Sequence, residues 1–172
     1  MKYKNLFSNK EQIMIGPLEI MPEKFSDERG YFLETWNQNK FNNCLEEEIL
    51  FVQDNESMSH KNVIRGLHFQ KSPFAQGKLI SVTKGKIYDV IVDIRENSPT
   101  FGTWAGIELN DFFNNQLWVP IGFAHGFITI SEFAHVRYKT TNYWSSFHER
   151  SLSWDDSYLN INWQISKYKL GN

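Results

Sequence analysis

Most of this chain consists of short segments in which apolar residues alternate with polar ones or follow each other directly. The segments are rich in β-branched and aromatic residues and are separated by Gly, Pro, Asn or Asp, which is typical of β-strands bounded by turns. We predict eight strands, over residues 49–53, 63–70, 78–83, 86–94, 104–109, 116–119, 126–130 and 135–141. So many short strands predict an all-β fold, either a sandwich or a barrel.

Helical periodicity is rare in the chain. Residues 38–48 are the clearest case, because Phe41, Leu45 and Ile49 recur at roughly helical spacing. A second short helix is predicted after Trp144. Between the strands at 78–83 and 86–94, the pair at 84–85 predicts a hairpin turn, since Gly85 accepts a positive φ without steric cost.

The composition excludes several classes of protein. The 172 residues fit one domain spanning 1–172, and a net charge of -2 from interspersed signs predicts no nucleic-acid surface. A single cysteine, Cys44, excludes an intrachain disulfide and fits a reducing compartment. There is no apolar run of membrane-spanning length and no apolar leader after Met1, so we predict a cytoplasmic protein with no membrane association.

Candidate chemistry begins at Arg65-Gly-Leu-His68, inside a predicted strand. Because alternate residues of a strand share a face, His68 lies with Gly66 and Gln70 and away from Leu67. It is either a hydrogen-bonded structural histidine or a base that works near neutral pH. Arg65 falls on the other face unless the strand bends at Gly66, where glycine would permit a bulge.

Two further polar side chains lie on apolar strand faces. Lys78 alternates with Ile80, so its ammonium is either at the rim, in water, or buried as a functional cation. Tyr138 shares a face with Val136 and points inward, as a hydrogen-bonded core tyrosine or as a proton donor. Asp156, in a turn-like segment, either orients a histidine or bends the backbone, and spacing alone leaves both open.

A metal site is not expected from the histidine pattern. Metal sites in small β-barrels draw on closely spaced ligands, such as two histidines two residues apart on one strand. The residue two positions after His68 is Gln70, although His125 remains a possible ligand. We therefore predict neither a metal nor a cofactor.

Nine short motifs follow one another along the chain in the same order as in a known protein family. They are FSDERGYFLE at 25–34, FVQDN at 51–55, VIRGLHFQ at 63–70, QGKL at 76–79, DVIVDIR at 89–95, SPTFG at 98–102, FAHGF at 123–127, YKTT at 138–141 and WDD at 154–156. From Ile15 to Trp163 the chain resembles the dTDP-4-dehydrorhamnose 3,5-epimerases, a family of cupin-type sugar-nucleotide epimerases.

The resemblance implies a jelly-roll, cupin-like barrel or sandwich with a few short helices, a homodimer, and proton transfer without a metal. It implies that His68 is the general base, that Tyr138 is the general acid on the opposite face of the sugar, and that Lys78 is the cation beside the enolate. Asp156 would hold His68 in its working tautomer. Contacts to the nucleotide are implied for Phe25, Arg29, Glu34, Gln53, Asp54, Asn55, Arg65, His125 and Glu149, some of them supplied by the partner subunit, with Phe25 stacking on the base.

The implied reaction inverts C3 and C5 of dTDP-4-keto-6-deoxy-D-glucose to give dTDP-4-keto-L-rhamnose, in the synthesis of a surface polysaccharide. The C4 ketone acidifies the neighbouring hydrogens, and a cation such as Lys78 stabilises the enolate as it forms. Inversion then needs a base on one face and a separate acid on the other, as His68 and Tyr138 would provide. The alternatives are inversion of C3 or C5 alone, a ketoisomerase acting on another nucleotide sugar, and a jelly roll that only binds.

Overall fold

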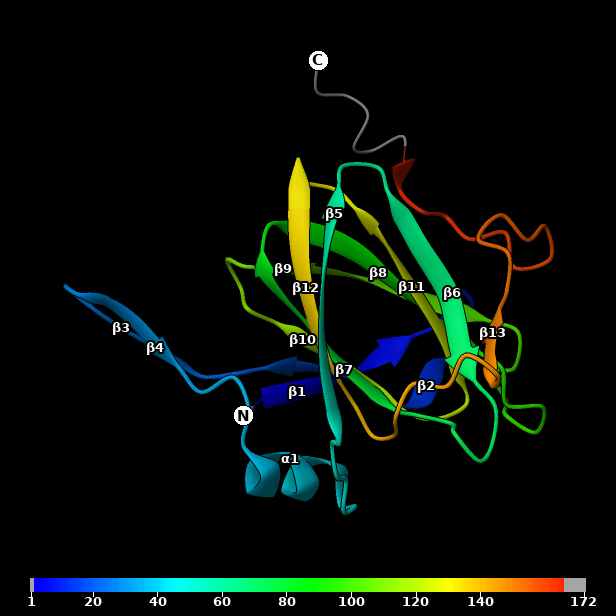
Figure 1. Cartoon of the computed structure of the whole chain (residues 1–172), viewed down its shortest axis with the longest axis horizontal. Helices are drawn as coiled ribbons and strands as arrows, with labels where there is room; N and C mark the ends of the chain where they lie inside the picture. Colours follow the sequence, from blue (N-terminus) through cyan, green and yellow to red (C-terminus); the bar gives the residue numbers. More distant parts are fainter. Residues whose placement is uncertain (1, 166–172) are drawn as a thin grey trace.

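Two antiparallel sheets form the body of the protein in a computed structural model that describes residues 2–165 (Figure 1). Within these residues, the first sheet has the strand order β1 (Lys2–Phe7), β2 (Ile13–Met21), β10 (Gln116–Val119), β7 (Lys78–Lys84), β12 (Phe133–Thr140) and β5 (Gln53–His60). The second has the order β13 (Glu149–Ser151), β6 (Ile64–Gln70), β11 (Phe123–Thr129), β8 (Lys86–Asp93) and β9 (Trp104–Asn110). Met1 and 166–172, which the predicted domain includes, lie outside the described residues.

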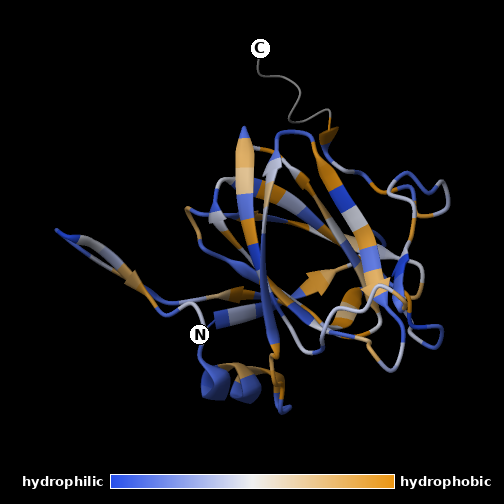
Figure 2. Ribbon diagram, viewed as in Figure 1, coloured by the Kyte–Doolittle hydropathy of each residue, from blue (hydrophilic) through white to orange (hydrophobic). Residues whose placement is uncertain are grey.

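The main core lies between the two sheets. Ile80 and Val82 of β7 are buried in one cluster with Ile87 and Ile91 of β8, which belongs to the other sheet. Figure 2 shows the underlying pattern, with apolar and polar residues alternating along strands such as β6. Full burial of one such aliphatic side chain stabilises the fold by about 1.5–3 kcal/mol, so the alternation directs each strand's apolar face inward.

Consecutive strands cross from one sheet to the other along most of the chain. β5, β7, β10 and β12 belong to the first sheet, whereas β6, β8, β11 and β13 belong to the second. This crossing is the jelly-roll arrangement, and it confirms the predicted fold class. It also corrects the hairpin predicted at 84–85: β7 pairs with β10 and β12, not with β8, so Gly85 (φ 84°) forms a corner between sheets.

The segment before β5 was predicted wrongly. Residues 49–52 are not a strand; Ile49 and Phe51 instead pack beside Phe41 of helix α1 (Gln38–Leu45) and Trp118 of β10. A segment buried against a helix needs apolar residues, as a strand does, but it does not need to pair with another strand. The apolar composition of this segment therefore resembled that of a strand. The strand itself begins at Gln53 and is mostly polar, which weakened its signal.

Of the two predicted helices only the first forms, and it is shorter than predicted. Helix α1 begins after Asn37, whose side chain accepts a hydrogen bond from the Lys40 backbone N–H, and it ends at Leu45 because Glu46 takes a left-handed conformation. The helix predicted after Trp144 does not form: residues 145–148 make a hydrogen-bonded turn, and the unpredicted strand β13 begins at Glu149. No helix among residues 2–165 is long and apolar enough to cross a membrane.

The N-terminal strands β1 and β2 were also not predicted, and neither was a two-stranded hairpin. The hairpin consists of β3 (Lys24–Asp27) and β4 (Gly30–Leu33) and projects away from the body (Figure 1). Its aromatic side chains are largely exposed, with 56% of Phe25, 59% of Tyr31 and 68% of Phe32 accessible to solvent. An arm of this kind has little support from its own chain.

Candidate active site

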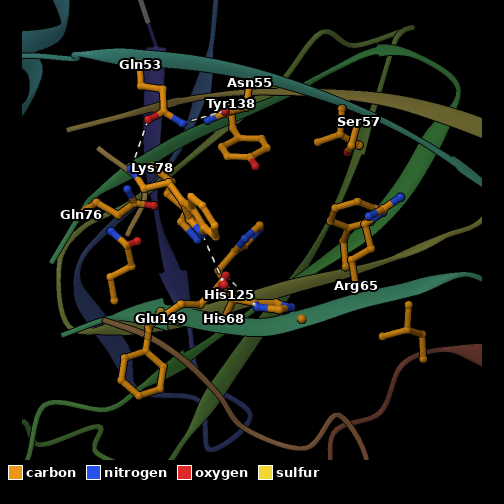
Figure 3. A pocket seen from close by; sticks show the side chains of 17 residues that line it. Gln53, Asn55, Ser57, Arg65, His68, Gln76, Lys78, His125, Tyr138 and Glu149 are labelled. Carbon is orange, nitrogen blue, oxygen red and sulfur yellow. Dashed lines mark hydrogen bonds and ion pairs between the residues drawn. The ribbon is translucent and has the colours of Figure 1, made fainter. Parts of the chain in front are cut away.

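A cavity of about 690 Å³ opens between the two sheets. Figure 3 shows polar side chains from both sheets converging on it. Of the residues predicted to act in a site, those that line it are Gln53, Asn55, Arg65, His68, Lys78, His125, Tyr138 and Glu149. The structure therefore brings the predicted base, acid and cation to one place.

The bend at Gly66 is what places Arg65 and His68 on the same cavity. Gly66 has a φ of 120°, and the pairing of β6 with β11 shifts register between His125 and Phe127. A Cβ atom at position 66 would lie 2.5 Å from the Cα of Gly126, so only glycine fits. The bulge that the sequence allowed at Gly66 is therefore confirmed.

His68 has a carboxylate partner from β13. Its Nδ1 lies 3.3 Å from Oε1 of Glu149, which reaches the cavity because β13 pairs with β6. The indole N–H of Trp144 donates to the other carboxylate oxygen of Glu149 at 3.3 Å. Trp144 was not predicted as a site residue, and only its position near Glu149 could have suggested it.

Asp156 is not the partner of His68. Its Oδ1 accepts hydrogen bonds from the backbone N–H groups of Tyr158 and Leu159, at 2.9 and 3.0 Å, and it lines a separate hollow with Trp154. Of the two roles that the sequence left open for Asp156, the structure shows the structural one, in which it bends the backbone. An aspartate in a turn readily accepts hydrogen bonds from the free N–H groups of the next residues.

Lys78 and Tyr138 come from neighbouring strands of the first sheet. Lys78 pairs with Thr140 and Ile80 pairs with Tyr138, so both polar side chains lie on the same face. Burial lowers the pKa of Lys78 below its ordinary value, although the charges of Glu149 and Asp89 oppose this shift. Burial also raises the pKa of Tyr138. Lys78 is therefore not a solvated lysine at the rim.

His125 forms a second and more buried pair. Its Nε2 lies 2.9 Å from Oδ2 of Asp89, and their side chains are 11% and 0% exposed. Burial raises the pKa of Asp89, and His125 opposes that rise. Asp89 was missed as a site residue; its signal in the sequence was a carboxylate within the apolar run of β8, which is costly to bury without a partner.

Comparisons with known proteins show the family of the chain. The sequence profile of the dTDP-4-dehydrorhamnose 3,5-epimerases matches residues 11–170. The chain belongs to this family. A dTDP-4-dehydrorhamnose 3,5-epimerase from Salmonella typhimurium is 50% identical over 150 residues, which cover 87% of this chain and 82% of the relative.

Two further relatives of this epimerase are informative. A crystal structure of dTDP-6-deoxy-D-glucose-3,5-epimerase from Legionella pneumophila, in complex with dTDP-4-keto-L-rhamnose, has a TM-score of 0.86 and 41% identity, covering 94% of this chain and 84% of that one. A dTDP-4-dehydrorhamnose 3-epimerase from Streptomyces niveus is 34% identical over 148 residues, covering 86% of this chain and 72% of the relative.

Four residues predicted to bind the nucleotide lie outside the epimerase's cavity. Phe25 and Arg29 are on the projecting hairpin, where Arg29 pairs with its neighbour Asp27 at 2.5 Å. Glu34 pairs with Lys40 at 2.7 Å, and Asp54 pairs with Lys139 at 2.9 Å. Asp54 faces outward because Gln53 and Asn55, its neighbours on β5, face the cavity.

The imidazoles and carboxylates of the described residues form pairs and not metal-binding clusters. Within residues 2–165, no group of three or more His, Cys, Asp or Glu side chains is arranged to hold a metal ion. The imidazoles of His68 and His125 each face a carboxylate instead.

Proposed function

We propose that this epimerase inverts C3 and C5 of dTDP-4-keto-6-deoxy-D-glucose to give dTDP-4-keto-L-rhamnose, by metal-independent proton transfer through an enolate. The observation that carries the proposal is the meeting of His68, Lys78 and Tyr138 around one cavity. Each comes from a different strand, and together they supply the base, cation and acid that the reaction needs.

The positions of the three groups support a two-faced reaction. Figure 3 shows His68 and Tyr138 on opposite sides of the cavity, on β6 of one sheet and β12 of the other. His68 takes the proton from carbon on one face of the sugar, and Tyr138 returns a proton on the other. The Lys78 ammonium stabilises the negative charge on the C4 oxygen, and a positioned charge counts for more in a partly dry cavity than in water.

The nucleotide would lie along the remaining polar groups of the cavity. The guanidinium of Arg65 is oriented by Nε, which donates to Ser59 Oγ at 2.7 Å, and by Nη2, which donates to the Met58 carbonyl at 3.3 Å. A guanidinium binds phosphate oxygens well, so Arg65 suits a diphosphate. Gln53 and Asn55 form a hydrogen-bonded pair at 2.8 Å nearby on β5.

Proton NMR in D₂O tests the reaction. The purified protein is incubated with dTDP-4-keto-6-deoxy-D-glucose, the loss of the C3 and C5 hydrogen signals is followed, and the epimers are reduced and identified. Exchange and inversion at both carbons are expected. In His68→Ala, turnover should fall about 100- to 10,000-fold, the usual contribution of a positioned acid–base group, while circular dichroism shows an intact fold. Wild-type activity in this variant would contradict the mechanism.

A mono-epimerase is the second candidate. It is favoured by the similarity to the Streptomyces niveus protein, which is named a 3-epimerase. The same NMR experiment separates the two, because a mono-epimerase exchanges and inverts one carbon only. Loss of neither signal would favour a ketoisomerase or epimerase acting on another nucleotide sugar.

We further propose that the enzyme is a homodimer in which the β3–β4 hairpin reaches the partner's cavity. Phe25 and Arg29, both predicted nucleotide contacts, lie on this exposed arm rather than in the cavity of their own chain. A second copy would cover the exposed aromatic side chains. The single cysteine supports a cytoplasmic setting, and we place the reaction in the synthesis of a rhamnose precursor for a surface polysaccharide.

A further inference from the structure

We propose that Glu149 is a positioning residue for His68 rather than a contact to the nucleotide. The proposal rests on the function proposed above, in which His68 is the general base. Glu149 Oε1 lies 3.3 Å from Nδ1 of His68. An ionised carboxylate attracts a nitrogen that bears a hydrogen and repels one that presents a lone pair, so this contact favours the tautomer with the hydrogen on Nδ1. The other ring nitrogen, Nε2, is then left with a lone pair that can take a proton.

Glu149 is itself held in place from its other side. The indole N–H of Trp144 donates to Oε2 at 3.3 Å, so each carboxylate oxygen has a protein partner. The loop that carries Trp144 is tied to the cavity wall by two amide side chains. The backbone N–H of Trp144 donates to Gln53 at 3.1 Å, and that of Ser145 donates to Gln70 at 2.6 Å. These bonds hold Trp144, a partner of Glu149, against the cavity wall.

Asp156, which the resemblance implied for this role, and two other carboxylates have different partners. Asp89 pairs with His125, Asp156 accepts two backbone N–H groups, and Asp54 pairs with Lys139. Within residues 2–165, His68 makes one ion pair, and its partner is Glu149. Glu149 is therefore the carboxylate that can set the tautomer and orientation of the base.

The charge of Glu149 also acts on the rest of the site. The titratable and charged groups that face the cavity from the surrounding strands are Arg65 on β6, Lys78 on β7, His125 on β11 and Tyr138 on β12. Asp89 on β8 is buried behind His125. Burial lowers the pKa of Lys78 and raises that of Tyr138, and Glu149 moves both values upward. Neutralising Glu149 should lower both pKa values, so Lys78 loses its positive charge at a lower pH.

The test compares Glu149→Gln and Glu149→Asp in steady-state kinetics of the full-length enzyme on dTDP-4-keto-6-deoxy-D-glucose. In Glu149→Gln we expect kcat to fall about 10- to 100-fold, part of what a positioned base contributes, while KM changes less than about 3-fold. The alkaline limb of the kcat profile should move to lower pH. Glu149→Asp keeps the charge on a shorter side chain and should recover part of kcat.

A matched control removes a carboxylate from another histidine pair. Glu56 Oε1 lies 3.8 Å from Nδ1 of His135 and outside the cavity, so Glu56→Gln should leave kcat and the pH profile unchanged. A raised KM with wild-type kcat in Glu149→Gln would overturn the proposal and make Glu149 a nucleotide contact. Wild-type kinetics would also overturn it, and if His68→Ala were inactive, the proposed function would still stand. Activity in His68→Ala would instead remove the proposed mechanism itself.

Discussion

At the scale of single residues, burial separates two similar imidazole–carboxylate pairs. The side chains of His68 and Glu149 are 45% and 37% exposed, whereas those of His125 and Asp89 are 11% and 0% exposed. A base must reach its substrate and exchange its proton with water, and the more open pair allows both. The closed pair suits a fixed hydrogen-bonding role toward a bound ligand. Sequence alone could not make this distinction, because both histidines lie in strands.

Tyr138 provides the residue-scale prediction. Tyr138→Phe removes only the hydroxyl, so His68 should still take protons from the substrate while reprotonation on the opposite face is impaired. We expect deuterium to enter at C3 and C5 in D₂O while net inversion falls at least about 100-fold, the lower range for a positioned acid. The measurement is NMR of the reduced sugars. Inversion of both centres at the wild-type rate would show that another group is the acid.

At the scale of elements, the course of β6 depends on one glycine. Gly66 lies where β6 and β11 approach so closely that a side chain would strike the backbone of Gly126. The resulting bend brings Arg65 to the same cavity as His68. A regular strand would have placed Arg65 and His68 on opposite faces. The site therefore depends on a bulge that interrupts the regular alternation of side chains along β6.

Gly66→Ala should therefore damage both stability and activity. The new Cβ would lie 2.5 Å from a backbone atom, and we expect a loss of about 2 kcal/mol or more in the free energy of unfolding. Gly30→Ala is the matched control, because Gly30 also has a positive φ of 127° but a Cβ there would meet no atom within 4 Å. It should cost roughly 1 kcal/mol. Equal losses in urea unfolding would show that backbone strain alone explains the effect.

Asp93, at the end of β8, should make the stability of the fold depend on pH in the acid range. Asp93 is fully buried, which by itself would raise its pKa, but hydrogen bonds from Arg95, Ser98 and Thr100 outweigh burial and lower it to about 2. Because the folded-state pKa lies below the ordinary 3.8, this stabilisation is present above pH 4 and is lost as the pH falls toward 2.

Asp93→Asn tests this. The variant should lose about 2 kcal/mol at pH 7, which corresponds to the lowered pKa, and the difference from the wild type should shrink between about pH 4 and pH 2. Urea unfolding at several pH values measures it. A difference that stays constant over this range would mean that the hydrogen bonds act without the charge.

At the scale of the whole molecule, the projecting hairpin suggests that one chain does not make a complete site. The cavity holds the proposed base, acid and cation, but Arg29 and Phe25 lie on an arm outside it. A symmetric dimer could exchange these arms, so that each cavity receives residues from the other chain.

Co-expression of two inactive variants tests the shared site. In a dimer of Arg29→Ala and His68→Ala chains, one cavity combines an intact His68 with an intact Arg29 from the partner. Random pairing should then recover about a quarter of wild-type activity. Activity no greater than that of either variant alone would show that Arg29 does not act across subunits. Light scattering of the wild type gives the oligomeric state independently.

The sequence by itself determined the all-β class and most strands of the two sheets. It also determined which faces His68, Lys78 and Tyr138 occupy, because the alternation within a strand is local and has a period of two. The order of the motifs indicated the family.

Only the tertiary structure decided which of these faces meet. Glu149 reaches His68 because β13 pairs with β6, a contact between segments far apart in the chain, whereas Asp156 is drawn into its own turn. The turn at Gly85 is likewise a corner, because sheet topology and not the two local residues selects the partners of β7 and β8. Pairing between distant strands depends on how the whole chain packs. The spacing of residues along the sequence therefore does not predict which strands pair.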